Sequence, residues 1–136
     1  MSTLTNIGGN QGDTGARGES LAAAFLRGSR GYALVAANWR NPRDRREEID
    51  LICRDGGAVV FVEVKTRAAA ARVPGYYAVD RRKKAALRRA IRTYLSLLRP
   101  RPRTFRFDVV EIELTAGSPT IRHFENIALF AKSFRP

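Results

Sequence analysis

Hydrophobic positions recur with two different periods along the chain, which predicts both helices and strands. Apolar residues return every three or four positions from about residue 16 to 28, and again from about 80 to 98. This spacing places them on one face of an α-helix. Pro100 and Pro102 end the second helix because proline cannot continue one. Its apolar face is formed by Leu87, Ala90, Ile91, Tyr94, Leu95 and Leu98.

Strict alternation of apolar and polar residues predicts the strands. A polar loop is expected between the first two, from Arg40 to Arg46, because Pro42 disfavours a regular ladder. The element order is then one helix, three strands, a helix and one or two strands. This order predicts an α/β fold with an αβββαβ core, a small mixed sheet flanked by helices. The predicted strands are residues 32–39, 48–53, 58–65, 105–114 and 120–124.

Few apolar residues occur near the N-terminus, and no internal repeat divides the chain. Residues 1–15 are rich in Gly, Asn, Thr and Ser, and we expect a flexible leader there. Residues 16–136 are expected to form one domain, including a loop over 68–77. A chain of 136 residues is long enough to build a hydrophobic core of its own.

A glycine pair places four charged residues of the second and third strands together. Gly56-Gly57 favours a tight hairpin turn, since both positions can adopt positive φ. Pairing outward from this turn sets Asp50 opposite Glu63 and Glu48 opposite Lys65, all on one side of the sheet. The other side carries Ile49, Leu51, Cys53, Val60, Val62 and Val64.

Two carboxylates directly opposite each other repel, and a divalent cation between them would compensate best. Oxygen ligands without thiolates or imidazoles suit Mg²⁺ or Mn²⁺. Asp50, Glu63 and the carbonyl of Val64 are the candidate metal ligands. Lys65, two residues after Glu63, could orient a water molecule or neutralise charge on a phosphate. This pattern predicts metal-dependent hydrolysis of a phosphodiester.

The same residues carry a resemblance to a known family. The runs Glu48-Ile49-Asp50-Leu51-Ile52 and Phe61-Val62-Glu63-Val64-Lys65-Thr66-Arg67 resemble the small, uncharacterised YraN-type proteins. That family is placed in the restriction-endonuclease-like PD-(D/E)xK superfamily. The resemblance covers about residues 15–130 and includes Gly18-Glu19, Asn38-Trp39-Arg40, Lys83 and the run from Arg106 to Val110.

The resemblance implies a restriction-endonuclease-like fold and a nuclease acting on DNA. Asp50 and Glu63 would be the metal ligands, Lys65 the catalytic lysine, and Glu19 an acid from the first helix beside the metal. Related resolvase-like nucleases cut branched DNA as dimers, so a homodimer is an expected assembly. In one departure from the family pattern, Glu47 stands where a glycine is usual.

Charge strengthens the case for a nucleic-acid partner. The chain has 25 Lys and Arg against 13 Asp and Glu, a net charge of +12, and such a surface attracts polyanions. The second helix carries Arg81, Arg82, Lys83, Lys84, Arg88, Arg89 and Arg92 opposite its apolar face. We interpret Arg82, Lys83 and Lys84 as phosphate contacts, and among them we expect Lys83 to come nearest the site; Arg67 is a further candidate. A simply solvated helix face is the alternative explanation.

Composition also excludes several function classes. One cysteine, Cys53, excludes an internal disulfide and a multi-thiolate zinc site. One histidine, His123, excludes a His-rich metal centre and receives no role here. No apolar run is long enough to span a membrane, and residues 1–15 lack the pattern of a signal peptide. We therefore expect a cytoplasmic protein with no membrane partner.

Several residues keep two interpretations. Glu48 either belongs to the site or forms a cross-strand ion pair with Lys65. Asp108 is either structural or close to the site. Trp39 and Cys53 are more typical of a core than of base stacking or catalysis.

Three functions remain open from the sequence. The first is a metal-dependent endonuclease acting on DNA, including branched or non-B-form DNA. The second is a catalytically inactive nucleic-acid-binding module of the same fold. The third is a subunit whose basic face binds an acidic protein. Metal-dependent cleavage separates the first from the second, and competition by DNA separates both from the third.

Overall fold

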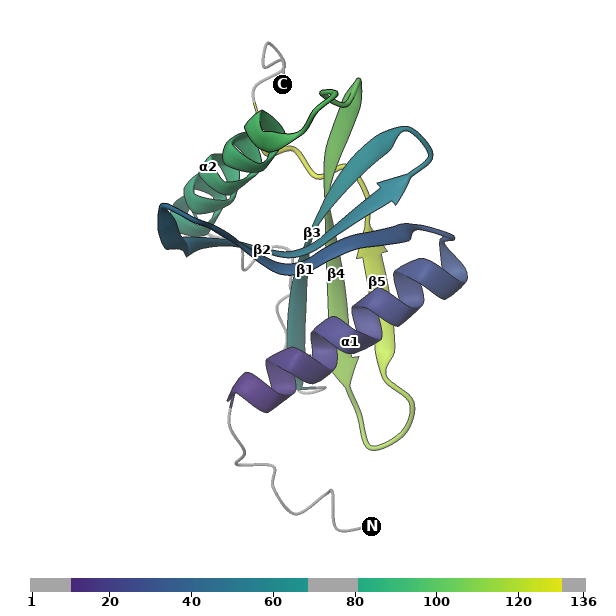
Figure 1. Ribbon diagram of the computed structural model, residues 1–136. Coiled ribbons are helices and arrows are strands. Elements are labelled where there is room, and N and C mark those ends of the chain that lie inside the picture. Colours follow the sequence, from purple (N-terminus) through teal and green to yellow (C-terminus); the bar gives the residue numbers. More distant parts are fainter. Residues whose placement is uncertain (1–10, 69–80, 131–136) are drawn as a thin grey trace.

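The structure is a five-stranded sheet with one helix on each face (Figure 1). The computed structural model describes residues 11–68 and 81–130. Strand order follows the chain; β3 and β4 are parallel, and the other neighbouring pairs are antiparallel. The predicted α/β class and αβββαβ order are confirmed. The elements are α1 (Gln11–Ser29), β1 (Ala33–Asn41), β2 (Asp44–Asp55), β3 (Ala58–Ala68), α2 (Arg81–Leu97), β4 (Thr104–Leu114) and β5 (Thr120–Phe124).

Each helix encloses its own hydrophobic core against the sheet. The crossover from β3 to the parallel strand β4 runs through α2, the usual way to join parallel neighbours. The core under α1 contains Ala22, Leu26, Leu51, Cys53, Val60, Val62, Val110 and Ile112. The core under α2 contains Ile49, Ile52, Val59, Phe61, Leu87, Ala90, Ile91, Leu95, Phe107 and Val109. The predicted apolar face of the second helix is thereby confirmed. Among the described residues, no helix combines the length and apolar character needed to cross a membrane.

The first helix begins earlier than predicted. Residues 11–15, expected in a flexible leader, form the N-terminal part of α1. That stretch has few apolar residues, so it carries no periodic signal from which a helix could be predicted. Residues 1–10, and positions 69–77 of the expected loop, lie outside the described residues.

The loop expected between Arg40 and Arg46 is instead a tight hairpin. Both strands continue to a two-residue turn, Pro42-Arg43. Proline fits there because a turn position needs no ladder hydrogen bond. The Asn41 side chain closes the turn by accepting a hydrogen bond from the Arg43 amide, 3.0 Å away. The arginine-rich segment is therefore an ordered hairpin that projects its charges in defined directions.

Ile49 lies on the other side of the sheet from the one predicted. Alternation grouped it with Leu51 and Cys53, but it packs in the core under α2. Figure 1 shows the reason: the β1–β2 hairpin turns away from β3 and runs toward α2. Strong local twist of this kind changes which face a strand presents.

α1 approaches β3 closely at Gly18. A Cβ at this position would overlap the Thr66 hydroxyl and lie 3.0 Å from Thr66 Cβ. We expect Gly18→Ala to lower the free energy of unfolding by about 1–3 kcal/mol, measured by urea denaturation.

Gly15 provides the matched control, since it is in the same helix and a Cβ there would meet nothing within 4 Å. Gly15→Ala should stabilise by about 0.5–1 kcal/mol through helix propensity. Adding Thr66→Ala to Gly18→Ala should recover part of the loss. Equal effects of the two glycine substitutions would contradict the close approach.

Candidate functional site

Asp50 and Glu63 lie together where β2 leaves β3. The β2–β3 ladder follows the predicted register as far as Leu51 opposite Val62, one residue before the two acids. Beyond this pair, the Val64 amide donates its hydrogen bond to a side chain of β2 instead of to its backbone: Asp50 Oδ2 accepts it at 2.8 Å. Asp50 is 6% exposed and Glu63 2%. The structure thus places two carboxyl groups side by side, away from water.

Two lysines converge on one oxygen of Glu63. Lys65 Nζ lies 3.4 Å from Glu63 Oε1, and Lys83 Nζ lies 3.3 Å from the same atom. Lys65 comes from β3, as predicted, whereas Lys83 reaches the site from α2. The second oxygen, Glu63 Oε2, is buried and has no hydrogen-bond partner within the described part of the chain. An acceptor left unsatisfied in this way is costly, and it is typical of a position that binds something else.

Burial and a neighbouring charge disfavour the ionised form of Asp50. Burial, and after it the negative charge of Glu63, raise the pKa of Asp50 to about 8, against the opposing hydrogen bond from the Val64 amide. Two adjacent buried acids cannot both ionise at low cost. A positive charge beside the pair would therefore favour its ionised form.

Glu19 brings a third acid toward the site from α1. Partial burial raises the pKa of Glu19; a hydrogen bond with the Asn38 side chain lowers it, and the charges of Glu48 and Glu63 raise it. Asn38 adopts a left-handed conformation with φ of 53°, which Asn tolerates better than most residues. The sequence prediction that Glu19 faces the sheet near the site is consistent with this environment; its role stays a prediction.

Lys83, the basic residue of the second helix that the sequence predicted nearest the site, contacts Glu63 directly. Burial alone would lower the pKa of Lys83, but the charges of Glu63, Asp50 and Glu48 outweigh it and raise the pKa. Lys83 therefore stays an ammonium ion beside the carboxylates. A phosphate contact from it stays a prediction.

Two predicted contacts are different in the structure. Glu48 was expected opposite Lys65, but its Oε2 pairs with Arg40 Nε on β1 at 3.1 Å. Arg67, expected to contact nucleic acid, has its Nε 2.9 Å from the fully buried carboxylate of Glu111. Its side chain is only 18% exposed. Arg67 is thus a partner of a buried acid, and a phosphate contact from it stays a prediction.

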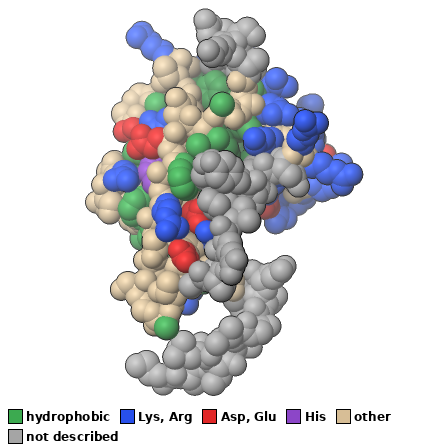
Figure 2. Space-filling model, turned by 180° about the vertical axis from the view of Figure 1, so that it is seen from behind, with side chains coloured by type: hydrophobic (Ala, Val, Ile, Leu, Met, Phe, Trp, Pro, Cys, Tyr) green, Lys and Arg blue, Asp and Glu red, His purple; other side chains and the backbone are tan. Residues whose placement is uncertain are grey.

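Many of the other basic residues gather on one surface (Figure 2). Figure 2 shows Lys and Arg side chains gathered on the side of the molecule that carries α2 and the β1–β2 hairpin. We call this the cationic surface. Arg82 is exposed within it and Lys84 is half-buried, and phosphate contacts from both stay predictions. Its exposed members are Arg43, Arg45, Arg46, Arg81, Arg82, Arg89 and Arg92.

Asp108 belongs to a separate network on the α1 side of the sheet. Its carboxylate accepts hydrogen bonds from the Asn126 amide at 2.9 Å and Arg106 Nε at 3.1 Å. His123 Nε2 lies 2.8 Å from the other oxygen, and Arg30 Nε donates to His123 Nδ1 at 3.2 Å. Because Arg30 can only donate, His123 Nδ1 accepts this bond, which leaves Nε2 as the ring nitrogen that donates to Asp108. Of the two interpretations of Asp108, the structural one agrees with these contacts.

Glu47, which the sequence marked only as a departure, is a buried connector between β2 and α2. Its Oε2 accepts a hydrogen bond from Asn41 Nδ2 at 2.9 Å, and its Oε1 pairs with Arg89 Nε at 2.7 Å. The sequence carries no signal for this role, because an acid among arginines looks solvent-exposed until the fold shows that it is buried and needs a cationic partner.

As for metals, no group of three or more His, Cys, Asp or Glu side chains within residues 11–68 and 81–130 is arranged to hold an ion. The two adjacent acids, Asp50 and Glu63, are the oxygen donors the site offers. Two carboxylates are within the number that Mg²⁺ usually takes from a protein, the rest being water and substrate oxygens.

Comparison with known proteins agrees with the motifs. A family model described as "Uncharacterised protein family UPF0102" matches residues 18–112. A UPF0102 protein of Symbiobacterium thermophilum is 48% identical over 99 residues, covering 73% of this chain and 80% of its own length. One from Geobacter metallireducens is 39% identical over 82% of this chain and 88% of its own, and one from Leifsonia xyli is 38% identical over 85% and 95%. The chain therefore belongs to the uncharacterised protein family UPF0102, the YraN-type family that its motifs resemble.

Proposed function

We propose that this protein is a metal-dependent nuclease that hydrolyses phosphodiester bonds in DNA, with Asp50, Glu63 and Lys65 at its centre. One observation carries the proposal: two buried carboxyl groups share a site in which Glu63 Oε2 has no partner among the described residues, beside two ammonium groups. A fold would gain stability by replacing these groups with apolar ones. Such a conflict between stability and residue choice is typical of a functional site.

A divalent cation fits this donor set. Asp50 and Glu63 would hold Mg²⁺ or Mn²⁺, which prefer carboxylate oxygens. The unsatisfied Glu63 Oε2 is the atom that supports binding there. Val64 is a further candidate through its carbonyl, since its amide already holds Asp50 in place. When bound, the cation would supply Lewis-acid polarisation of a phosphodiester.

The residues of the chain would divide the remaining work. Lys65 and Lys83, both within 3.4 Å of Glu63, would neutralise charge that develops on a phosphate during hydrolysis. Glu19 would add negative charge from the opposite helix and favour cation binding. The helix α2 would bring the substrate backbone to the site, because Lys83 and the cationic surface lie on the same helix.

The αβββαβ order and the spacing of Asp50, Glu63 and Lys65 also support placement of the family in the restriction-endonuclease-like superfamily. The central acids in this arrangement lie on adjacent strands of one hairpin. Sequence-specific base reading is not part of the proposal, since the cationic surface suits phosphates rather than base edges. Branched or otherwise non-B-form DNA is the substrate we expect first.

Cleavage assays test the proposal. Labelled duplex, single-stranded and four-way-junction DNA would be incubated with the protein and either Mn²⁺ or Mg²⁺. Asp50→Asn and Lys65→Met should each lower the cleavage rate by at least about 100-fold, the typical cost of losing an electrostatic group at a reacting centre.

The control is Arg27→Gln, an exposed arginine on α1 away from the site, which should cleave like wild type. Cleavage that persists in both site variants would come from a contaminant or another site, and would refute the assignment.

A second candidate function is an inactive nucleic-acid-binding module. One observation favours it: Lys65 and Lys83 already balance Glu63, and the Val64 amide binds Asp50, so the site is largely compensated without a metal. Calorimetric titration with Mn²⁺ separates the two functions. The nuclease requires a binding event that Glu63→Gln abolishes and Glu125→Gln, at an exposed acid, does not. The inactive module predicts no such event.

A further inference from the structure

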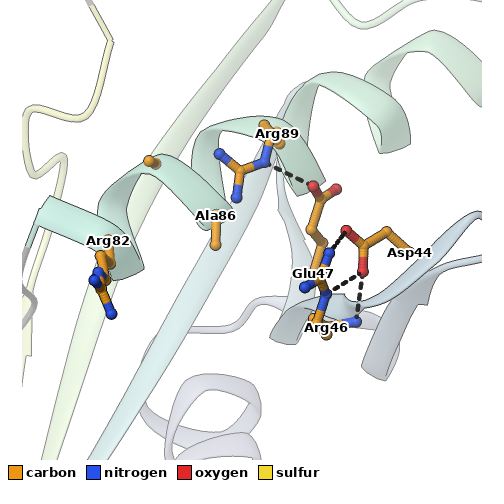
Figure 3. A pocket seen from close by; sticks show the side chains of 7 residues that line it. Asp44, Arg46, Glu47, Arg82, Ala86 and Arg89 are labelled. Atoms are coloured by element: carbon orange, nitrogen blue, oxygen red, sulfur yellow. Dashed lines mark hydrogen bonds and ion pairs between the residues drawn. The ribbon is translucent and has the colours of Figure 1, made fainter.

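A pocket opens between α2 and the β1–β2 hairpin, separate from the Asp50–Glu63 site. It has a volume of about 480 Å³ and lies within the cationic surface (Figure 3). Three arginines line the pocket, and the small side chains of Ala85 and Ala86 on α2 leave room for a ligand. The lining residues are Asp44, Arg46, Glu47, Arg82, Ala85, Ala86 and Arg89.

The guanidinium of Arg89 is oriented by a buried acid, Glu47. Its Nε pairs with Glu47 Oε1 at 2.7 Å, and Glu47 is itself fixed by Asn41. Figure 3 shows the two terminal nitrogens of Arg89 on the side of the guanidinium away from Glu47. The Arg89 side chain is 58% exposed, so those donors are accessible. A guanidinium oriented by a buried acid loses less entropy when it binds an anion than a free one does.

Arg46 is oriented in the same manner. Its Nε and one terminal nitrogen pair with the two oxygens of Asp44 at 2.9 and 3.0 Å. The Arg46 side chain remains 91% exposed at the mouth of the pocket. Both acids of the pocket thus serve to position an arginine, and Arg82 adds a third cation from the first turn of α2.

We propose that this pocket is a subsite for a backbone phosphate of a nucleic acid, with Arg89 as its main ligand and Arg46 and Arg82 beside it. Guanidinium groups suit phosphate because their planar donors match two oxygens at once. This proposal adds a substrate-binding site to the proposed function, and it rests on the binding of nucleic acid but not on its cleavage.

The surroundings favour a long polyanion over a small phosphorylated ligand. A small ligand requires a pocket that encloses most of its surface, whereas this one lies between a single helix and a hairpin and is continuous with further exposed arginines. Lys83, which contacts Glu63, precedes Arg89 by six residues, or about 9 Å along the helix axis. A nucleic-acid strand held in the pocket would therefore run along α2 past the candidate site.

DNA binding without divalent metal tests the subsite. Fluorescence anisotropy of a labelled DNA duplex would be followed over a range of NaCl concentrations in the presence of EDTA. Arg89→Gln should weaken binding about three- to tenfold at low salt and lower the slope of log K against log salt by about 1, the loss of one phosphate contact. The matched control Arg27→Gln, exposed and outside the pocket, should keep the wild-type slope.

Glu47→Gln distinguishes positioning from net charge. The substitution adds one positive charge, so a surface that acts through charge alone would bind DNA more tightly. If Glu47 positions Arg89, affinity should fall instead, and Arg89→Gln should have a smaller further effect in the Glu47→Gln background. Circular dichroism would verify that each variant is folded.

Two results would overturn the subsite. One is an Arg89→Gln variant that matches Arg27→Gln in affinity and salt slope. The other is a wild-type protein that does not bind DNA at low salt, which would point to an acidic protein as the partner of this surface. Because metal is absent, neither result depends on cleavage: loss of the nuclease with the Arg89 effect intact would leave the subsite standing.

Discussion

Asp50→Asn should make the metal-free protein more stable than wild type at pH 8. The pKa of Asp50 is raised to about 8 by burial and by the charge of Glu63, from an ordinary value of 3.8. Between these values the folded protein keeps a proton that the unfolded chain releases. Stability therefore falls as the pH rises through this window, by up to ~1.4 kcal/mol per pH unit.

Asparagine removes that dependence because it cannot ionise, yet its side-chain oxygen can still accept the Val64 hydrogen bond. We expect Asp50→Asn to gain about 2–4 kcal/mol over wild type at pH 8 and to differ little near pH 4. Urea denaturation from pH 4 to 9, in EDTA, measures both curves.

Asp44→Asn is the control for this experiment. Hydrogen bonds from Arg46 lower the pKa of Asp44, so its ionised form is favoured by folding, in contrast to Asp50. The control should not gain stability as the pH rises. Parallel curves for wild type and Asp50→Asn would show that Asp50 ionises in the folded protein as freely as in water.

The register of the β2–β3 hairpin was predictable because glycine and alternation are local signals. Gly56, with φ of 58°, forms the turn that the sequence indicated, and pairing proceeds from it to Leu51 and Val62. Both α2 and β4 could also be predicted from the sequence, since the apolar residues of each recur with a single period. The hairpin register and the periodic apolar faces were sufficient to predict most of the fold and the proximity of Asp50 to Glu63.

What the sequence could not predict depends on side chains that meet across the fold. Arginine-rich residues after Arg40 looked like a loop, but Asn41 closes a turn and Glu47 ties the hairpin to α2. The bend of that hairpin moved Ile49 to the other core. Likewise, Arg67 was turned to Glu111, because a buried acid selects its partner by proximity rather than by sequence pattern.

Asp108 differs from the Asp50–Glu63 pair in how its surroundings compensate burial. Glu63 keeps one buried oxygen without a partner among the described residues, although Lys65 and Lys83 pair with the other oxygen. Asp108 is fully buried and surrounded by donors. Burial alone would raise the pKa of Asp108, but hydrogen bonds from His123, Asn126 and Arg106 outweigh it and hold the pKa below its ordinary value. The fold itself thus compensates Asp108 more completely than Glu63.

Asp108→Ala should therefore be among the most destabilising single substitutions in this protein. It would leave the half-buried Arg106 without its main partner and the Asn126 amide without an acceptor, a loss we expect to be about 3–5 kcal/mol. Urea denaturation at pH 7 measures it. Asp55→Asn is the control, because Asp55 also binds Arg106 but is exposed, and it should lose under about 1 kcal/mol. A cost for Asp108→Ala no larger than this control would mean that the network does not hold β4, β5 and the end of α1 together.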